Sequence, residues 1–272
     1  MSDYTVLLTG ANGFLGSSLK EYLQTKKVNV ETASIRTKND IDNLIQMINT
    51  AKVHYKILNA GWSGVINGSL NRETQNENLE LQEYLFKIAD SSSVLRFINF
   101  GSYNEYGSVN GLLTEDITDL KPVSEYAIVK NALRESIENS KNAEKYLHIR
   151  IANVYGPRQP SSSLYGTLLR YSGKPLYFGA GNALRDLLYI GDFCNAILHV
   201  LGSDLNGVLN IGSGISVTNK DFIIRVSESL KIPNSQLHFD HQKRDNIFMS
   251  DDFTLSIDKV KTLLGWSPDC NY

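Results

Sequence analysis

A tyrosine and a lysine stand four residues apart in the segment Tyr126-Ala-Ile-Val-Lys130. On a helix, residues at this spacing lie on one face a turn apart, so the phenol and the ammonium are neighbours. A phenol with a pKa of about 10 exchanges protons poorly at neutral pH, and a nearby ammonium lowers that pKa. The pair therefore predicts general acid–base chemistry, with Tyr126 as the proton donor and Lys130 as its partner.

A serine lies close after the apolar, strand-like segment Val94–Phe100. In open α/β sheets, ligands bind beyond the carboxyl ends of the strands, which is where Ser102 falls. Its hydroxyl can hold a substrate carbonyl beside a phenol. We expect Ser102, Tyr126 and Lys130 to form one catalytic group.

Three glycines spaced GxxGxxG, at positions 10, 13 and 16, separate a strand pattern from a helix pattern. Such a turn brings backbone N–H groups and a helix N-terminus close to a pyrophosphate. An ordinary βα turn is the alternative, but the position on the first βα junction favours a dinucleotide site. The expected contacts are Gly10, Asn12, Gly13, Phe14, Leu15 and Gly16.

The end of the second strand-like segment, Val28–Ala33, indicates which dinucleotide is bound. An NAD site has a carboxylate there for the ribose 2′-OH. This chain has Ser34 and Arg36, followed by Lys38, although Glu31 is near in sequence. A hydroxyl and a guanidinium suit a 2′-phosphate. We therefore expect NADP(H) rather than NAD(H), with Ser34 and Arg36 as contacts.

Strand-like and helix-like segments must alternate to position these residues. Helical spacing between short apolar strands predicts βαβ units and a parallel sheet. The fold class is α/β: a Rossmann-type doubly wound parallel sheet with a smaller α/β substrate-binding lobe. Residues 1–153 form the expected NADP-binding domain, with a returning strand near 208–211. Residues 154–272, which are richer in Gly, Pro and Ser loops, form the expected lobe.

The composition fits this interpretation. The chain has 272 residues, a net charge of −2 and 42% apolar residues, which exclude a disordered chain and argue against a nucleic-acid surface. It holds two cysteines, contains no apolar run of membrane-spanning length, and starts without a basic leader, so a reducing cytoplasm is expected. No metal site is predicted, because His238 and His241 lack supporting ligands.

Taken together, these segments resemble an extended short-chain dehydrogenase/reductase acting on nucleotide sugars, of the NAD-dependent epimerase/dehydratase family. The resemblance runs nearly end to end. It is carried by TGANGFLG, FGSYNEYG (100–107), the Tyr126 and Lys130 interval, RIANVYGP (150–157), GAGNALRDLLYIGD (179–192) and LGWSP (264–268).

The resemblance implies further site residues. Asn59, Ala60 and Gly61 would contact the cofactor, together with Lys130. The nucleotide sugar would contact Asn153 and Arg185 through its phosphates, with Arg244 as a further phosphate contact and Ser63 and Asn104 elsewhere in the site. A homodimer through a helix bundle that includes the Tyr126 helix is also implied.

The residue types narrow the reaction. Dehydratases of this family have an acid two positions before the tyrosine of the serine segment, and fucose-synthase-like members have a cysteine there. This chain has Asn104, with Glu105 one position away. The segment most resembles that of GDP-4-keto-6-deoxy-D-mannose reductases. We therefore expect NADPH-dependent reduction at C4 of a nucleotide-linked 4-keto-6-deoxy hexose or heptose, in glycan or O-antigen precursor synthesis.

Two other functions stay open. One is a nucleotide-sugar 4-epimerase that keeps NAD tightly bound. The other is a non-catalytic NADP-sensing protein, which typically loses the tyrosine or the lysine. The sequence does not choose among GDP, CDP, dTDP and UDP as the nucleotide. Glu125 before the tyrosine and Val129 before the lysine depart from the usual family residues.

Overall fold

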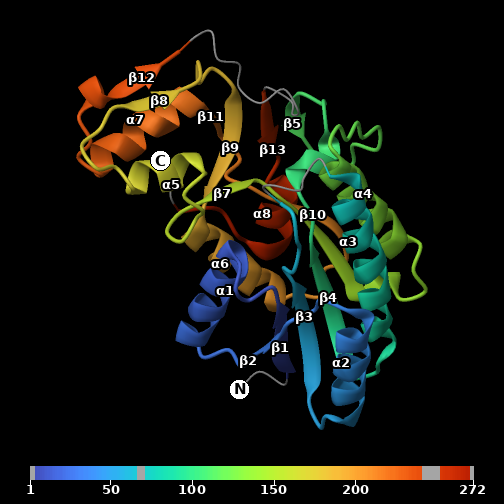
Figure 1. Ribbon diagram of the computed structural model, residues 1–272. Helices are drawn as coiled ribbons and strands as arrows, with labels where there is room; N and C mark the ends of the chain where they lie inside the picture. The colour runs from blue at the N-terminus through green and yellow to red at the C-terminus, as the bar shows by residue number, and fades with distance from the viewer. Residues whose placement is uncertain (1–3, 66–70, 241–251, 270–272) are drawn as a thin grey trace.

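The computed structural model describes residues 4–65, 71–240 and 252–269, and centres on a six-stranded parallel sheet of order β10-β6-β4-β3-β1-β2 (Figure 1). The predicted α/β fold class is confirmed. The strand predicted near 208–211 pairs with β6 at the sheet edge. The strands are β1 (Tyr4–Thr9), β2 (Val30–Ala33), β3 (His54–Asn59), β4 (Val94–Phe100), β6 (Tyr146–Ile151) and β10 (Gly207–Ile211).

Helices cover both faces of the sheet, because both faces of its strands are apolar. Leu7 and the residues at matching positions on the neighbouring strands pack against one helix layer. Leu8 and the residues at its matching positions pack against the other layer. The first layer is α2 (Lys38–Thr50), α3 (Arg72–Leu85) and α4 (Glu125–Glu138). The second contains α1 (Phe14–Thr25), α6 (Ile190–Leu201) and α8 (Asp258–Leu264).

The strand order reverses between β1 and β3, and this switch point is where doubly wound sheets bind ligands. The chain leaves β1 toward β2 on one side and returns through α2 to β3 on the other. Within the residues described, β2 is the edge strand, so the segment that follows it lies at the border of the sheet.

A smaller lobe lies beyond the carboxyl edge of the sheet, at the upper left of Figure 1. It has its own small core, which includes Phe178 and Ile223. Its elements are β7 (Asn153–Tyr155), α5 (Leu164–Leu169), β8 (Leu176–Phe178), β9 (Leu184–Tyr189), β11 (Ser216–Thr218), α7 (Asn219–Ser229) and β12 (Leu237–Phe239).

Short elements complete the chain. Strands β5 (Gly111–Leu113) and β13 (Phe253–Leu255) pair in parallel beside the lobe. The 3-10 turns are η1 (Phe86–Asp90), η2 (Tyr103–Tyr106), η3 (Ala143–Lys145) and η4 (Asn234–Gln236). Over the described ranges, none of the helices has the length and apolar character needed to cross a bilayer.

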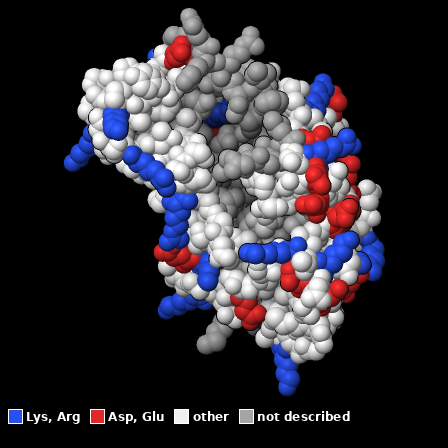
Figure 2. Space-filling view, viewed as in Figure 1, with Lys and Arg blue, Asp and Glu red and all other residues white. Residues whose placement is uncertain are grey.

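Positive and negative side chains are mixed on the surface formed by α2, α3 and α4. Over the face shown in Figure 2, Lys and Arg lie beside Asp and Glu near α2, α3 and α4. The contacts agree: Lys38 pairs with Glu80, and Arg134 pairs with Glu138 on the surface of α4.

Candidate active site

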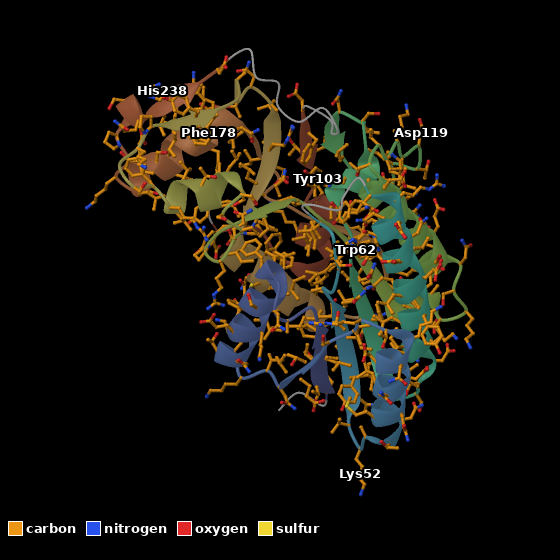
Figure 3. All side chains as sticks on the ribbon, in the orientation of Figure 1. Lys52, Trp62, Tyr103, Asp119, Phe178 and His238 are labelled. Carbon is orange, nitrogen blue, oxygen red and sulfur yellow. The ribbon has the colours of Figure 1, made fainter. Side chains whose placement is uncertain are left out.

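A cavity of about 760 Å³ lies at the carboxyl edge of the sheet. Its wall includes the glycine turn, the segment after β4, the start of α4 and the chain from β6 into the lobe. Trp62 and Tyr103, labelled in Figure 3, both lie here, between the sheet and the lobe. This is the switch-point position expected for a ligand site.

The glycine turn is built for close approach. Gly10 has a φ of +68°, and a Cβ there would lie 2.6 Å from the Ala60 carbonyl carbon. A Cβ on Gly16 would lie 2.2 Å from the Gly10 carbonyl oxygen. No side chain caps the first turn of α1, whose N-cap is Gly13. The turn therefore fits a dinucleotide pyrophosphate, which would take the N–H groups at this helix N-terminus.

Most of the expected cofactor residues line the cavity. Its wall includes Gly10, Gly13, Phe14, Leu15, Gly16, Ala60 and Lys130. Asn12 is exposed and is not part of this wall. Asn59 and Gly61 are also outside it: the Asn59 side chain is buried behind the wall, and the Gly61 N–H donates to Thr9 Oγ1.

The segment after β2 is exposed and also lies outside this wall. The carboxylates on either side of Ser34 and Arg36 are both engaged. Glu31 accepts a hydrogen bond from the Tyr55 hydroxyl at 3.3 Å. Asp40 accepts the N–H groups of Arg36 and Thr37 at 2.9 and 2.8 Å, and these bonds lower the pKa of its carboxyl.

The three expected catalytic residues meet on the cavity wall. Helix α4 begins at Glu125, capped by the Ser124 hydroxyl, so Tyr126 sits in its first turn. The phenol of Tyr126 hydrogen-bonds to Ser102, which comes from the turn after β4. One turn along α4, Lys130 Nζ donates to the Phe100 carbonyl at 2.7 Å.

The electrostatics of the pair differ from the sequence-based prediction. Burial raises the pKa of Tyr126, and the Ser102 hydrogen bond only partly offsets this effect. The prediction that Lys130 lowers the pKa of Tyr126 was therefore wrong for this arrangement, in which the ammonium is directed to the Phe100 carbonyl. Burial lowers the pKa of Lys130 itself to about 7.

Trp62 contacts both members of the pair. The Lys130 ammonium lies 3.6 Å from the centroid of the indole ring. The Tyr126 ring meets the indole edge to face, with centroids 5.9 Å apart. The indole N–H donates to the Gln75 side chain, which is fully buried. Trp62 is therefore part of the cavity wall.

Asn104, at the acid position of the serine segment, and its neighbour Glu105 lie on different sides of the cavity wall. Asn104 lines the cavity, and its buried side-chain oxygen has no hydrogen-bond partner. Glu105 is fully buried behind the wall, where it bonds to His148, Arg150 and the Ser102 N–H. The carboxylate nearest in sequence to the dehydratase position is therefore turned away from the cavity.

The expected substrate residues fall in different places. Asn104 and Asn153 line the cavity. Ser63 and Arg185 do not: the Ser63 hydroxyl donates to Asn78, and Arg185 is buried with Nη1 on the Leu184 carbonyl. Arg244 lies outside the described residues.

Sequence reasoning missed several cavity residues. Tyr103, Gln159, Ser162 and Ser163 are on the wall. The side-chain oxygen of Gln159 is buried and has no hydrogen-bond partner, as in Asn104. The Pro157–Ser163 loop gave a weak signal, because its turn residues mark a loop after a β-strand without showing which side chains face inward.

The remaining candidates are structural. His148 is a buried histidine that bonds to Asn99 and Glu105, whereas His199 is exposed. Cys194 is a buried thiol with its pKa raised to about 12 by burial. In the described ranges, no group of three His, Cys, Asp or Glu side chains is placed to hold a metal ion.

Comparison with known proteins agrees with this geometry. Residues 6–212 match the NAD dependent epimerase/dehydratase family. This chain belongs to that family. It is an extended short-chain dehydrogenase/reductase, and its relatives act on nucleotide sugars.

Similar proteins carry out different reactions. The chain is 25% identical to the CDP-abequose synthase of Yersinia pseudotuberculosis, over 90% of this chain and 91% of that protein. It is 23% identical to the UDP-glucose 4-epimerase of Mycolicibacterium smegmatis, over 96% and 93%. The structure of MoeE5 in complex with UDP-glucose and NAD has a TM-score of 0.81 and 25% identity, covering 98% of this chain and 94% of MoeE5.

Proposed function

We propose that this protein uses NADPH to reduce the C4 keto group of a nucleotide-linked 4-keto-6-deoxy sugar. The observation that carries the proposal is the pair Asn104 and Glu105. The amide faces the cavity, and the carboxylate is buried behind it. Elimination of water needs an acid–base group beside the sugar, and the amide does not transfer protons. The similarity to a CDP-abequose synthase supports reduction.

The choice of NADPH rests on the end of β2. With Glu31 bonded to Tyr55 and Asp40 capping α2, the two carboxylates nearest Ser34 in sequence are engaged. The exposed Ser34 hydroxyl and Arg36 guanidinium suit a 2′-phosphate instead.

The chain's own groups supply the acid, the orientation and the electrostatics. When bound, the nicotinamide supplies a hydride to the carbonyl carbon. Tyr126 donates a proton to the carbonyl oxygen, and Ser102 hydrogen-bonds that oxygen as its negative charge develops. The Lys130 ammonium, 5.7 Å from the centroid of the Tyr126 ring, would contact the ribose of the nicotinamide.

Other polar groups on the cavity wall would orient the sugar. The unpartnered oxygens of Asn104 and Gln159 would accept hydrogen bonds from sugar hydroxyls, which satisfies atoms that are otherwise buried at a cost. Asn153 would contact the diphosphate. Holding the C4 carbonyl within reach of Tyr126 contributes much of the rate.

Residues 1–153, with β10 returning to their sheet, form the cofactor-binding part in this proposal, and residues 154–272 supply most of the sugar-binding lobe. The division is not sharp in sequence, because α6, β10 and α8 of the second half pack on the first. We also propose a homodimer through a bundle of helices that includes α4, and light scattering measures the oligomeric state directly. Ile128, 44% exposed on α4, would be covered in such a dimer. A cytoplasmic location remains a prediction.

A 4-epimerase with tightly bound NAD is the second candidate. It is favoured by the similarity to a UDP-glucose 4-epimerase and by the NAD bound to MoeE5. Incubation with NADPH and a panel of GDP-, CDP- and dTDP-4-keto-6-deoxy sugars separates the two. A reductase consumes NADPH in equal amount to product, and NMR identifies an alcohol at C4. Interconversion of a nucleotide hexose without added cofactor would instead show the epimerase.

A further inference from the structure

A row of buried polar side chains crosses the sheet just behind the active site. Thr9, Asn59, Asn99 and His148 occupy matching register positions on β1, β3, β4 and β6. They lie on the α2–α4 face, two residues beyond the apolar side chains that fill it. All four side chains are at most 3% exposed. Polar groups are retained at such depth only when they are hydrogen-bonded.

The hydrogen bonds of this row run in one direction. Thr9 donates to Asn59 at 2.7 Å, and Asn59 donates to Asn99 Oδ1 at 2.8 Å. The amide nitrogen of Asn99 therefore faces His148 Nδ1 at 3.1 Å, which makes that ring nitrogen the acceptor. The Nε2–H of His148 is then the donor to Glu105, at 3.0 Å. The row therefore ends on a carboxylate, with His148 bonded to Asn99 through Nδ1 and to Glu105 through Nε2.

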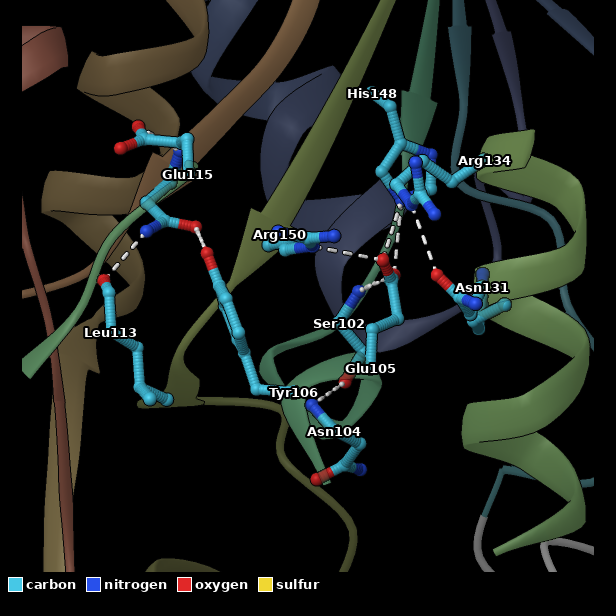
Figure 4. Close-up of polar contacts among 12 residues, drawn as sticks. Ser102, Asn104, Glu105, Tyr106, Leu113, Glu115, Asn131, Arg134, His148 and Arg150 are labelled. Carbon is cyan, nitrogen blue, oxygen red and sulfur yellow. Dashed lines mark hydrogen bonds and ion pairs between the residues drawn. The ribbon is translucent and has the colours of Figure 1, made fainter. Parts of the chain in front are cut away.

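Glu105 is held from several sides (Figure 4). Arg150 Nε donates to it at 3.1 Å, and the Ser102 N–H donates at 2.7 Å. Its side chain is 0% exposed. Burial by itself raises the pKa of Glu105, but His148, Arg150 and the Ser102 N–H outweigh this effect and lower it to about 2. The carboxylate is thus a fixed negative charge inside the protein.

The segment Phe100–Ser102 rests directly on this carboxylate. A Cβ on Gly101 would lie 2.4 Å from Glu105 Oε1 and 2.2 Å from His148 Nε2, so only glycine fits between. At one end of the segment the Phe100 carbonyl accepts the Lys130 ammonium, and at the other the Ser102 hydroxyl bonds to Tyr126. Both catalytic contacts are therefore made by a segment anchored on Glu105.

We propose that Glu105 is a positioning residue, which fixes the Phe100–Ser102 segment and keeps Lys130 in its ammonium form through its buried negative charge. The charged and titratable groups facing the pair Tyr126 and Lys130 include Glu105 and Tyr103, both from η2. The charge of Glu105 raises the pKa of both Tyr126 and Lys130, which favours the phenol and the ammonium. The catalytic consequence rests on the proposed function, whereas the effect on Lys130 does not.

The test is a titration of Lys130 that needs no substrate. In protein labelled with [13Cε]lysine, the Lys130 resonance is assigned by its loss in Lys130→Arg. We expect the wild-type midpoint near pH 7. In Glu105→Gln, removal of the buried charge should lower this midpoint by about one pH unit. A folded Glu105→Gln protein that titrates at the wild-type midpoint would overturn the proposal.

Glu115→Gln is the matched control. Glu115 also accepts a backbone N–H, from Asn210 at 2.8 Å, but it lies on the far side of Tyr106. The same substitution there should leave the Lys130 midpoint unchanged. If Glu105→Gln does not fold, Arg150→Gln tests the same negative charge by another route. It removes the cation that partly neutralises the Glu105 carboxylate, so its effect on Lys130 should be opposite to that of Glu105→Gln. The midpoint must then rise, and an unmoved or lowered midpoint contradicts the proposal.

Activity gives an independent readout. In Glu105→Gln, the pH limb of kcat that reports Lys130 should move down with the NMR midpoint, while KM for NADPH changes little. If no nucleotide sugar is reduced by the wild-type protein, the proposed function fails while the titration still decides the role of Glu105. If reduction is observed and the titration is unmoved, the role of Glu105 fails alone.

Discussion

The ammonium of Lys130 lies 3.6 Å from the centroid of the Trp62 ring, and this ring also meets the Tyr126 ring edge to face. Trp62 therefore contacts both residues of the acid–base pair. Its orientation is fixed by the hydrogen bond from its indole N–H to Gln75. A buried cation over an indole face is stabilised by about 2 kcal/mol, which is enough to affect protonation near neutral pH.

Replacement of this aromatic face should make Lys130 lose its proton more readily. We expect Trp62→Leu to lower the Lys130 pKa, about 7 in the wild type, by about one unit. Activity at pH 7 then falls about fivefold, because fewer molecules carry the ammonium. Trp62→Phe, which keeps a ring face, should stay near the wild type. A pH profile of kcat that is identical in Trp62→Leu and wild type would refute this role.

Removal of the Tyr126 hydroxyl should slow turnover sharply and leave the cofactor site intact. Loss of a positioned proton donor costs roughly 10²–10⁴-fold in rate. The glycine turn that would hold the pyrophosphate does not depend on the phenol, so Tyr126→Phe should bind NADPH as the wild type does. Fluorescence titration of NADPH and steady-state rates measure the two effects. Turnover at the wild-type rate in Tyr126→Phe would exclude Tyr126 as the acid.

Cofactor preference should follow the exposed residues after β2. The double substitution Ser34→Asp with Arg36→Ala supplies a carboxylate for a ribose hydroxyl and removes a cation for a 2′-phosphate. Loss of one charge-assisted hydrogen bond costs about 1.5–3 kcal/mol, so the ratio of kcat/KM for NADPH over NADH should fall at least about tenfold. Lys141→Ala removes a surface cation paired with Asp90 and serves as the control. An unchanged ratio in the double variant would mean that other residues select the cofactor.

Glu105 should also govern stability in acid. Its folded pKa of about 2 lies below its ordinary value of 4.5 in an unfolded chain, so its stabilising contribution is present above pH 4.5 and is lost as pH falls toward 2. The contribution is about 3 kcal/mol at neutral pH. Urea unfolding at several pH values should show a shallower loss of stability between pH 4.5 and 2 in Glu105→Gln than in the wild type. Equal slopes in the two proteins would argue against a charged Glu105.

Much of the fold followed from apolar periodicity. The strand-like segment Val94–Phe100 is β4 to the residue, and the pair Tyr126 and Lys130, whose spacing fits a helix, lies on α4. The start of α3 at Arg72 could not be predicted, because its first turns are polar and show no apolar stripe. The three-residue strands of the lobe, such as β7 and β8, are too short to show a period.

Some features of the site could be predicted from the sequence and others could not, for a physical reason. Ser102, Tyr126 and Lys130 could be found because their chemistry depends on residue type and spacing. The direction of the Tyr126 pKa shift could not, because it depends on burial and on where the Lys130 ammonium points. The roles of Trp62 and Glu105 were likewise hidden, since each acts through contacts with residues distant in sequence.

A reductase makes a net transfer of hydride from external NADPH to a sugar carbon. The most direct measurement uses NADPH deuterated at the transferred C4 position of its nicotinamide, with the 4-keto sugar that supports turnover. Reduction predicts one deuterium at C4 of the product sugar for each NADPH oxidised, seen by mass spectrometry and NMR. A converted sugar that carries no deuterium from added NADPH would exclude reduction and point to an epimerase that retains its own cofactor.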